Sequence, residues 1–96
     1  MSEPVLSAAE VDDAIAEQQL QWTRQDDQLV TSVKLHDFAA ALKFVNAVGA
    51  AAEAVNHHPD IDIRWNTVNL TLTTHDSGGL TVLDLALAGA IDRLRP

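Results

Sequence analysis

Apolar residues recur at steps of three and four through the middle of the chain, and this is its clearest pattern. Such spacing places side chains along one side of an α-helix, because one helical turn takes 3.6 residues. Asp37 precedes the run as a suitable N-cap, and Pro59 follows where a helix cannot continue. The pattern predicts a long helix that ends at about Val55. Its apolar stripe consists of Phe38, Ala41, Leu42, Val45, Val48, Ala52 and Val55.

Two shorter helices are predicted near the ends of the chain. Ser7 and Glu10 form a capping box, in which each side chain can accept the other residue's backbone N–H, and this predicts a helix over about Ala8–Glu17. Thr81 and Asp84 repeat the arrangement at the start of the last helix. The apolar stripe of that helix consists of Leu83, Leu87, Ala90, Ile91 and Leu94.

Apolar and polar residues alternate in the remaining segments, which is the pattern of half-buried strands. One hairpin is predicted from strands near Leu20–Gln25 and Gln28–Leu35, around a short acidic turn. A second hairpin starts at about Ile61, turns near Asn66 and continues through the alternating segment 68–72. Strands joined by hairpins form an antiparallel sheet, and helices must cover its apolar face. The sequence therefore predicts an α+β two-layer sandwich over residues 1–96, one domain with four strands and three helices on one face.

Composition narrows the possible classes of protein. The net charge of −8 disfavours contact with nucleic acid or anionic membranes. The chain has no cysteine, which excludes disulfides and thiol catalysis. No apolar run approaches the roughly 20 residues of a membrane span, and the acidic N-terminus lacks the features of a signal peptide. We expect a cytoplasmic protein that binds neither nucleic acid nor membrane.

Alanines flank the stripe of the long helix. Small side chains let a second helix approach closely, which favours burial in an oligomer, although alanine is also the best helix former. These residues are Ala39, Ala40, Ala47, Ala50, Ala51 and Ala54.

Three histidines flank the second predicted hairpin. Because its strands return antiparallel, His75 is brought back towards His57 and His58, and Glu53 lies one helical turn before His57. Imidazole exchanges protons near neutral pH, so this group of side chains suits general acid–base chemistry. Nearby hydroxyls are offered by Thr73, Thr74 and Ser77.

Simpler interpretations exist for each of these residues. A histidine pair after a helix can be a solvated cap, and Asp84 is explained by capping alone. Trp22 and Trp65 could form an aromatic wall for a flat ligand, but such residues most often belong to a core. A metal site is not expected, because adjacent histidines diverge and the chain has neither cysteine nor an H-x-x-x-H pair.

The spacing of these residues resembles the signature of the pterin-4a-carbinolamine dehydratases. The pattern reads Glu53, three residues, His57-His58-Pro59, five residues, Trp65, nine residues, His75, eight residues and Asp84. The resemblance extends from Leu6-Ser7 to Ile91. Trp65 stands where the family has an aromatic residue, often tyrosine, and Gln21 stands where it often has glycine.

The resemblance implies dehydration of 4a-hydroxytetrahydropterin to quinonoid dihydropterin, without metal or organic cofactor. It implies three catalytic histidines: His57 and His75 as acid and base, and His58 to position the pterin and assist in proton delivery. It also implies that Glu53 hydrogen-bonds the ligand or orients His57, and that Asp84 supports the site electrostatically. Further contacts to the pterin are expected from Thr73, Thr74 and Trp65. It also implies a homodimer or homotetramer. The alternatives are a non-catalytic module on the same fold, acting in pterin binding or as a co-regulator or assembly partner.

Overall fold

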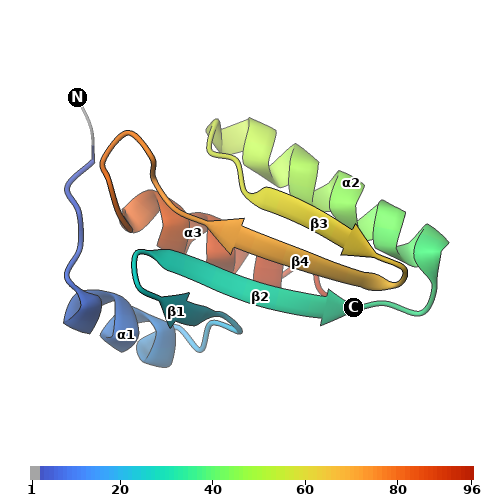
Figure 1. Ribbon diagram of the computed structural model, residues 1–96, viewed down its shortest axis with the longest axis horizontal. Coiled ribbons are helices and arrows are strands. Elements are labelled where there is room, and N and C mark those ends of the chain that lie inside the picture. The colour runs from blue at the N-terminus through green and yellow to red at the C-terminus, as the bar shows by residue number, and fades with distance from the viewer. Residues whose placement is uncertain (1–2) are drawn as a thin grey trace.

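The computed structural model describes residues 3–96 and shows a four-stranded antiparallel sheet with three helices on one face (Figure 1). This confirms the predicted fold class and the predicted order of elements. The strands lie in the order β1-β2-β4-β3, so that β2 and β4 join the two hairpins at the centre of the sheet. The elements are α1 (Ala8–Glu17), β1 (Thr23–Gln25), β2 (Gln28–Lys34), α2 (Phe38–Val55), β3 (Asp60–Arg64), β4 (Thr67–Leu72) and α3 (Val82–Asp92).

The caps determine where the helices begin. Both hydrogen bonds of the capping box form between Ser7 and Glu10, and the Asp37 side chain accepts a hydrogen bond from the backbone N–H of Ala40 at 2.8 Å. The strands are less well predicted. β1 begins at Thr23 rather than near Leu20, because the backbone N–H of Leu20 still bonds to the end of α1.

One face of the sheet is apolar and lies beneath the helices. The register of β2 and β4 pairs Leu29 with Leu72 and Val33 with Val68, and all four side chains are buried. Successive strand residues point to opposite faces. The other face is therefore polar, and it remains open.

α2 and α3 bury residues that differ in part from the apolar stripes predicted from the sequence. α2 buries Ala41, Val48 and Ala52 as expected, but it adds Phe44 and leaves Phe38, Leu42 and Val55 exposed. A helix packed on a sheet contacts it through only one stripe of side chains. The apolar residues of α2 cover a wider part of the helix surface than that stripe, so some of them stay exposed. α3 likewise buries Leu85 and Ala88 beside Leu87 and Ile91, because it contacts both α1 and α2.

Trp22 belongs to the core and not to a ligand wall, which corrects one sequence interpretation. Its side chain is 4% exposed, and its Nε1–H donates a hydrogen bond of 2.9 Å to Asp92. The same carboxylate accepts the backbone N–H of Gln21 and the Nε–H of Arg95. These contacts fasten the end of α3 to the start of β1.

One helix among residues 3–96, α2, is long and apolar enough to cross a membrane, with 18 residues and a mean hydropathy of 1.4. This length and hydropathy come closer to those of a membrane span than we expected from the sequence. The core helix of a globular protein can have the same length and hydropathy. Here α2 packs against β4 and α3 and carries Lys43 and Glu53.

Candidate active site

The end of α2 directs the first histidine back towards the body of the protein. Asn56 caps the helix in the left-handed conformation (φ 50°), which asparagine tolerates better than most residues. The backbone N–H of His57 then bonds to the carbonyl of Ala52 at 3.2 Å, and Pro59 leads into β3. The tight reversal carries His57 under the helix end, where it meets α3.

His57 contacts a buried carboxylate. Its side chain is 11% exposed, and its Nε2 lies 2.6 Å from Oδ1 of Asp84, which is fully buried at the third position of α3. The other carboxylate oxygen accepts the backbone N–H of Thr81 at 3.0 Å and the hydroxyl of Thr74 at 2.7 Å. The start of a helix favours a carboxylate, and here both oxygens of Asp84 have hydrogen-bond partners.

The hydroxyls beside Asp84 form one ordered chain. The Thr74 hydroxyl donates its single proton to the Asp84 carboxylate, so the Thr81 hydroxyl must donate to Thr74 across 2.8 Å. The Thr81 oxygen in turn accepts the backbone N–H of Leu83 at 3.2 Å. The capping residue of α3 therefore fixes the carboxylate that holds His57. Sequence reasoning identified Thr81 as a cap but missed this second role.

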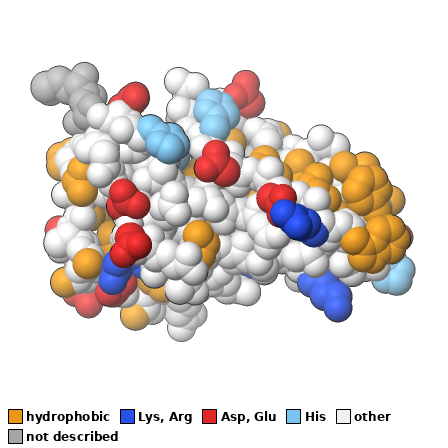
Figure 2. Space-filling view, viewed as in Figure 1, with side chains coloured by type: hydrophobic (Ala, Val, Ile, Leu, Met, Phe, Trp, Pro, Cys, Tyr) orange, Lys and Arg blue, Asp and Glu red, His pale blue; other side chains and the backbone are white. Residues whose placement is uncertain are grey.

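His57, His58 and His75 all line one hollow of about 280 Å³ between the end of α2 and the loop after β4. This confirms that the hairpin returns His75 to the histidine pair. The lining is completed by Asn56, Thr73, Thr74, Asp76 and Leu83, of which Asn56, Asp76 and Leu83 were not predicted. Figure 2 shows histidine and acidic side chains gathered along one edge of the molecule.

The loop after β4 is held by backbone hydrogen bonds. The N–H of Thr74 bonds to the carbonyl of Gly79, and the N–H of Gly78 bonds to the carbonyl of Thr74. Gly78 has a φ of 79°, which glycine adopts without strain. The exposed His75 is carried by this closed turn, whereas the buried Ser77 hydroxyl does not line the hollow.

Two predicted residues lie at the margin of the site. Glu53 does not line the hollow, but its carboxylate pairs with Nε2 of His58, and both side chains are mostly exposed. Thr73 lines the hollow while its hydroxyl donates to the carbonyl of Asp27 at 2.8 Å. Glu53 can therefore orient His58 and not His57, whose partner is Asp84. Thr73 ties the end of β4 to the β1–β2 turn.

Trp65 is not brought to the histidines within one chain. It sits in the β3–β4 turn with a φ of 56°, and its side chain is 68% exposed and stacks on Phe38 at 6.5 Å between ring centroids. The histidines lie at the other end of the hairpin, and five residues of β3 separate the two ends. At about 3.3 Å per residue this is roughly 15 Å. Trp65 therefore lies outside the hollow that the histidines line, and its contact with the pterin stays a prediction.

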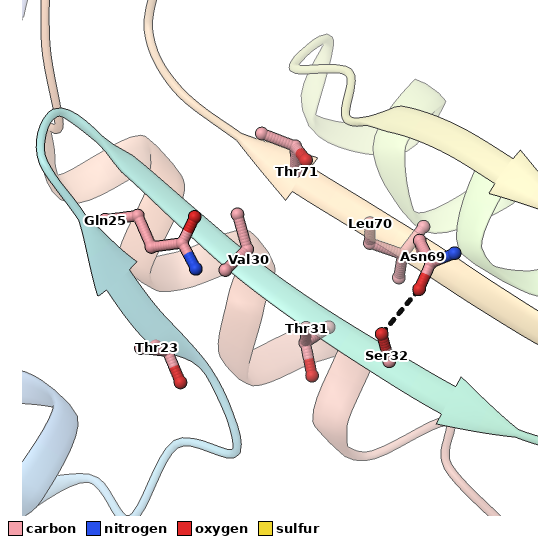
Figure 3. A pocket seen from close by; sticks show the side chains of 8 residues that line it. All are labelled: Thr23, Gln25, Val30, Thr31, Ser32, Asn69, Leu70 and Thr71. Atoms are coloured by element: carbon pink, nitrogen blue, oxygen red, sulfur yellow. Dashed lines mark hydrogen bonds between the residues drawn. The ribbon is translucent and has the colours of Figure 1, made fainter.

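A second hollow, of about 350 Å³, lies on the open face of the sheet (Figure 3). Its polar lining carries hydroxyls and amides but no titratable side chain: Thr23, Gln25, Thr31, Ser32, Asn69 and Thr71. It therefore lacks groups for acid–base chemistry. Across the described residues 3–96, no group of three or more His, Cys, Asp or Glu side chains is arranged to hold a metal ion.

Comparison with solved structures places this fold beside known proteins. The crystal structure of a transcriptional coactivator/pterin dehydratase from Brucella melitensis superposes with a TM-score of 0.88 at 28% identity, covering 96% of this chain and 99% of the other. A pterin dehydratase-like protein identified as a RuBisCO assembly factor in the alpha-carboxysome gives a TM-score of 0.63 at 24% identity, covering 78% of this chain and 87% of the other. The second likeness shows the fold alone.

Sequence comparison is more specific. A Chloroflexus aurantiacus protein, named provisionally as a pterin-4-alpha-carbinolamine dehydratase, is 50% identical over 91 residues, which cover 95% of this chain and 97% of the relative. The sequence model of the Pterin 4 alpha carbinolamine dehydratase family matches residues 4–94. The chain therefore belongs to the pterin-4-alpha-carbinolamine dehydratase family.

Proposed function

We propose that this protein dehydrates 4a-hydroxytetrahydropterin to quinonoid dihydropterin in tetrahydropterin recycling. The reaction breaks the bond between C4a and its hydroxyl group, which leaves as water after taking up one proton. N5 loses its proton, and the electron pair forms the C4a–N5 double bond. One acid and one base are required, and no electrons are exchanged with a second reactant. We therefore expect no metal or organic cofactor beyond the pterin substrate.

The paired His57 and Asp84 carry the proposal. With a carboxylate as acceptor, Nε2 of His57 is the nitrogen that donates to Asp84, which leaves Nδ1 as the ring nitrogen that can take up a proton. A buried carboxylate in this position fixes the tautomer and orientation of an imidazole and stabilises the imidazolium that forms on proton uptake. His57 is thus suited to act as the base that removes the N5 proton.

The other two histidines complete the proposed set. His75 is exposed and lines the same hollow, so it can donate a proton to the departing hydroxyl and regain one from solvent. His58 also lines the hollow and is paired with Glu53, which suits it to hold the pterin ring. Thr73 and Thr74 also line the same space.

The test is the rate of dehydration of freshly generated 4a-hydroxytetrahydropterin by wild type and two histidine variants. We expect His57→Ala to lower kcat by about 10²–10⁴-fold, the usual contribution of one positioned acid or base. His36→Ala is the matched control, because His36 is exposed and does not line the hollow. It should retain full activity.

Full activity of a folded His57→Ala variant would reject the proposed base. A wild-type protein that binds the pterin without accelerating dehydration would support a non-catalytic role on this fold.

A further inference from the structure

An apolar hollow adjoins the histidine site. It has a volume of about 310 Å³ and lies between the end of α2 and the outer side of α3. His57 and Leu83 line both this hollow and the histidine site, so the two spaces share a wall. The remaining apolar wall includes Val55, Ala86 and Ala90.

One cation stands at this hollow. Arg93 lines it from the end of α3, and the lining contains no carboxylate. The chain has only six lysines and arginines against a net charge of −8. Arg24, Arg64 and Arg95 each contact an aspartate, whereas within residues 3–96 no carboxylate lies within 4.0 Å of Arg93. Its guanidinium is therefore available to an anion from outside the chain.

The chemistry of the ring specifies which part of the substrate faces this hollow. N5 of a pterin is bonded to C4a on one side and to C6 on the other. If His57 removes the N5 proton, the substituent on C6 projects from the ring next to His57. His57 is one of the residues that line both hollows. The volume lies within the range of small-molecule pockets, roughly 300–1,000 Å³.

We propose that the hollow between α2 and α3 binds the C6 substituent of the pterin and favours an aryl group that ends in a carboxylate. Its apolar wall would cover the aryl ring, and Arg93 would pair with the carboxylate. The inference depends on the proposed function, because it takes the pterin ring to lie against His57.

The test is calorimetric binding of three 7,8-dihydropterins, which lack the 4a-hydroxyl group and do not react. Their C6 substituents are methyl, 1,2-dihydroxypropyl and 4-carboxyanilinomethyl. We expect the aryl carboxylate to bind about 10-fold more tightly than the methyl compound, because it buries additional apolar surface. Ala86→Phe should remove this difference and leave the affinity for the methyl compound unchanged, since Ala86 is an exposed residue of the apolar wall.

Arg93→Gln tests the contribution of the positive charge alone. It should weaken binding of the aryl carboxylate alone by about 2- to 5-fold, as expected for one exposed ion pair. Arg64→Gln is the matched control, because Arg64 is exposed at the far end of β3 and should change none of the three affinities. Circular dichroism verifies that each variant is folded, and Ala86→Leu replaces Ala86→Phe if that variant is not.

The outcomes separate the two proposals. Equal affinities for the methyl and aryl compounds, or equal losses of both in Ala86→Phe, would overturn the inference while the dehydratase function stands. If wild type binds none of the three pterins, the proposed function fails and the inference falls with it.

Discussion

A single side chain, Asp84, connects the folding of α3 to the proposed chemistry. One of its oxygens caps the helix through the backbone of Thr81, and the other holds Nε2 of His57. The residues alone were explained by capping, while the family resemblance implied that Asp84 also supports the site. Only the packing of the α2 end against the start of α3 shows that both roles belong to the same carboxylate.

Replacing Asp84 with Asn tests the orienting role with little change in shape. The amide cannot hold His57 in the same tautomer while also accepting from Thr81 and Thr74, so kcat for dehydration should fall by about 10²-fold or more. Thr81→Ser keeps the capping hydroxyl and should retain kcat within about twofold. Stopped-flow absorbance of the pterin measures both rates. A normal kcat in a folded Asp84→Asn variant would remove Asp84 from the proposed mechanism.

At the scale of elements, the starts of the helices were predicted well from the sequence, whereas the packing of the elements was not. α1 and α2 begin directly after the N-cap residues predicted from the sequence, because an N-cap interacts only with its own helix. The buried side of α2 could not be chosen between Phe38 and Phe44, since that choice depends on where the sheet lies. Trp65 fits the linear spacing of the family signature, yet strand pairing places it at the opposite end of the hairpin from His75.

An ion pair joins α1 to the first hairpin and should make stability depend on pH. Hydrogen bonding by Arg24 lowers the pKa of Asp12 below its ordinary value of 3.8. A group whose pKa is lower in the folded than in the unfolded state stabilises the protein when the pH is above the unfolded-state pKa. This stabilisation is lost as the pH falls through the folded-state pKa. Asp12→Asn should therefore lower the urea midpoint at pH 7, and the difference from wild type should shrink below pH 3.8.

Asp13→Asn is the matched control for this measurement, because Asp13 is exposed and follows Asp12 directly in α1. Both Asp12 and Arg24 reach solvent, so the effect should be small and should weaken with added salt. An equal loss in both variants would mean that helix charge, rather than the pair, is responsible.

At the scale of the whole molecule, apolar surface remains uncovered. Phe38 and Leu42 of α2 are exposed, and β1 and β3 are open edge strands of the sheet. Uncovered apolar residues and unpaired strand edges are features that association between copies removes. We therefore propose that the protein acts as a homodimer or homotetramer.

Light scattering should give a mass of two or four times 10.4 kDa. Leu42→Glu places a charge on the exposed side of α2 and should reduce the mass to that of a smaller assembly. Gln18→Glu adds the same charge at the end of α1 and should leave the mass unchanged. A wild-type mass of 10.4 kDa at micromolar concentration would reject the proposed oligomer.

The contrasting surroundings of the two tryptophans give the protein two distinguishable fluorescent reporters. Trp22 is enclosed and hydrogen-bonded to Asp92, whereas Trp65 is open to solvent on its stack with Phe38. An ionic quencher such as iodide reaches an exposed indole and not an enclosed one. The quenchable emission thus reports on the β3–β4 turn, and the protected emission reports on the integrity of the core, without any introduced label.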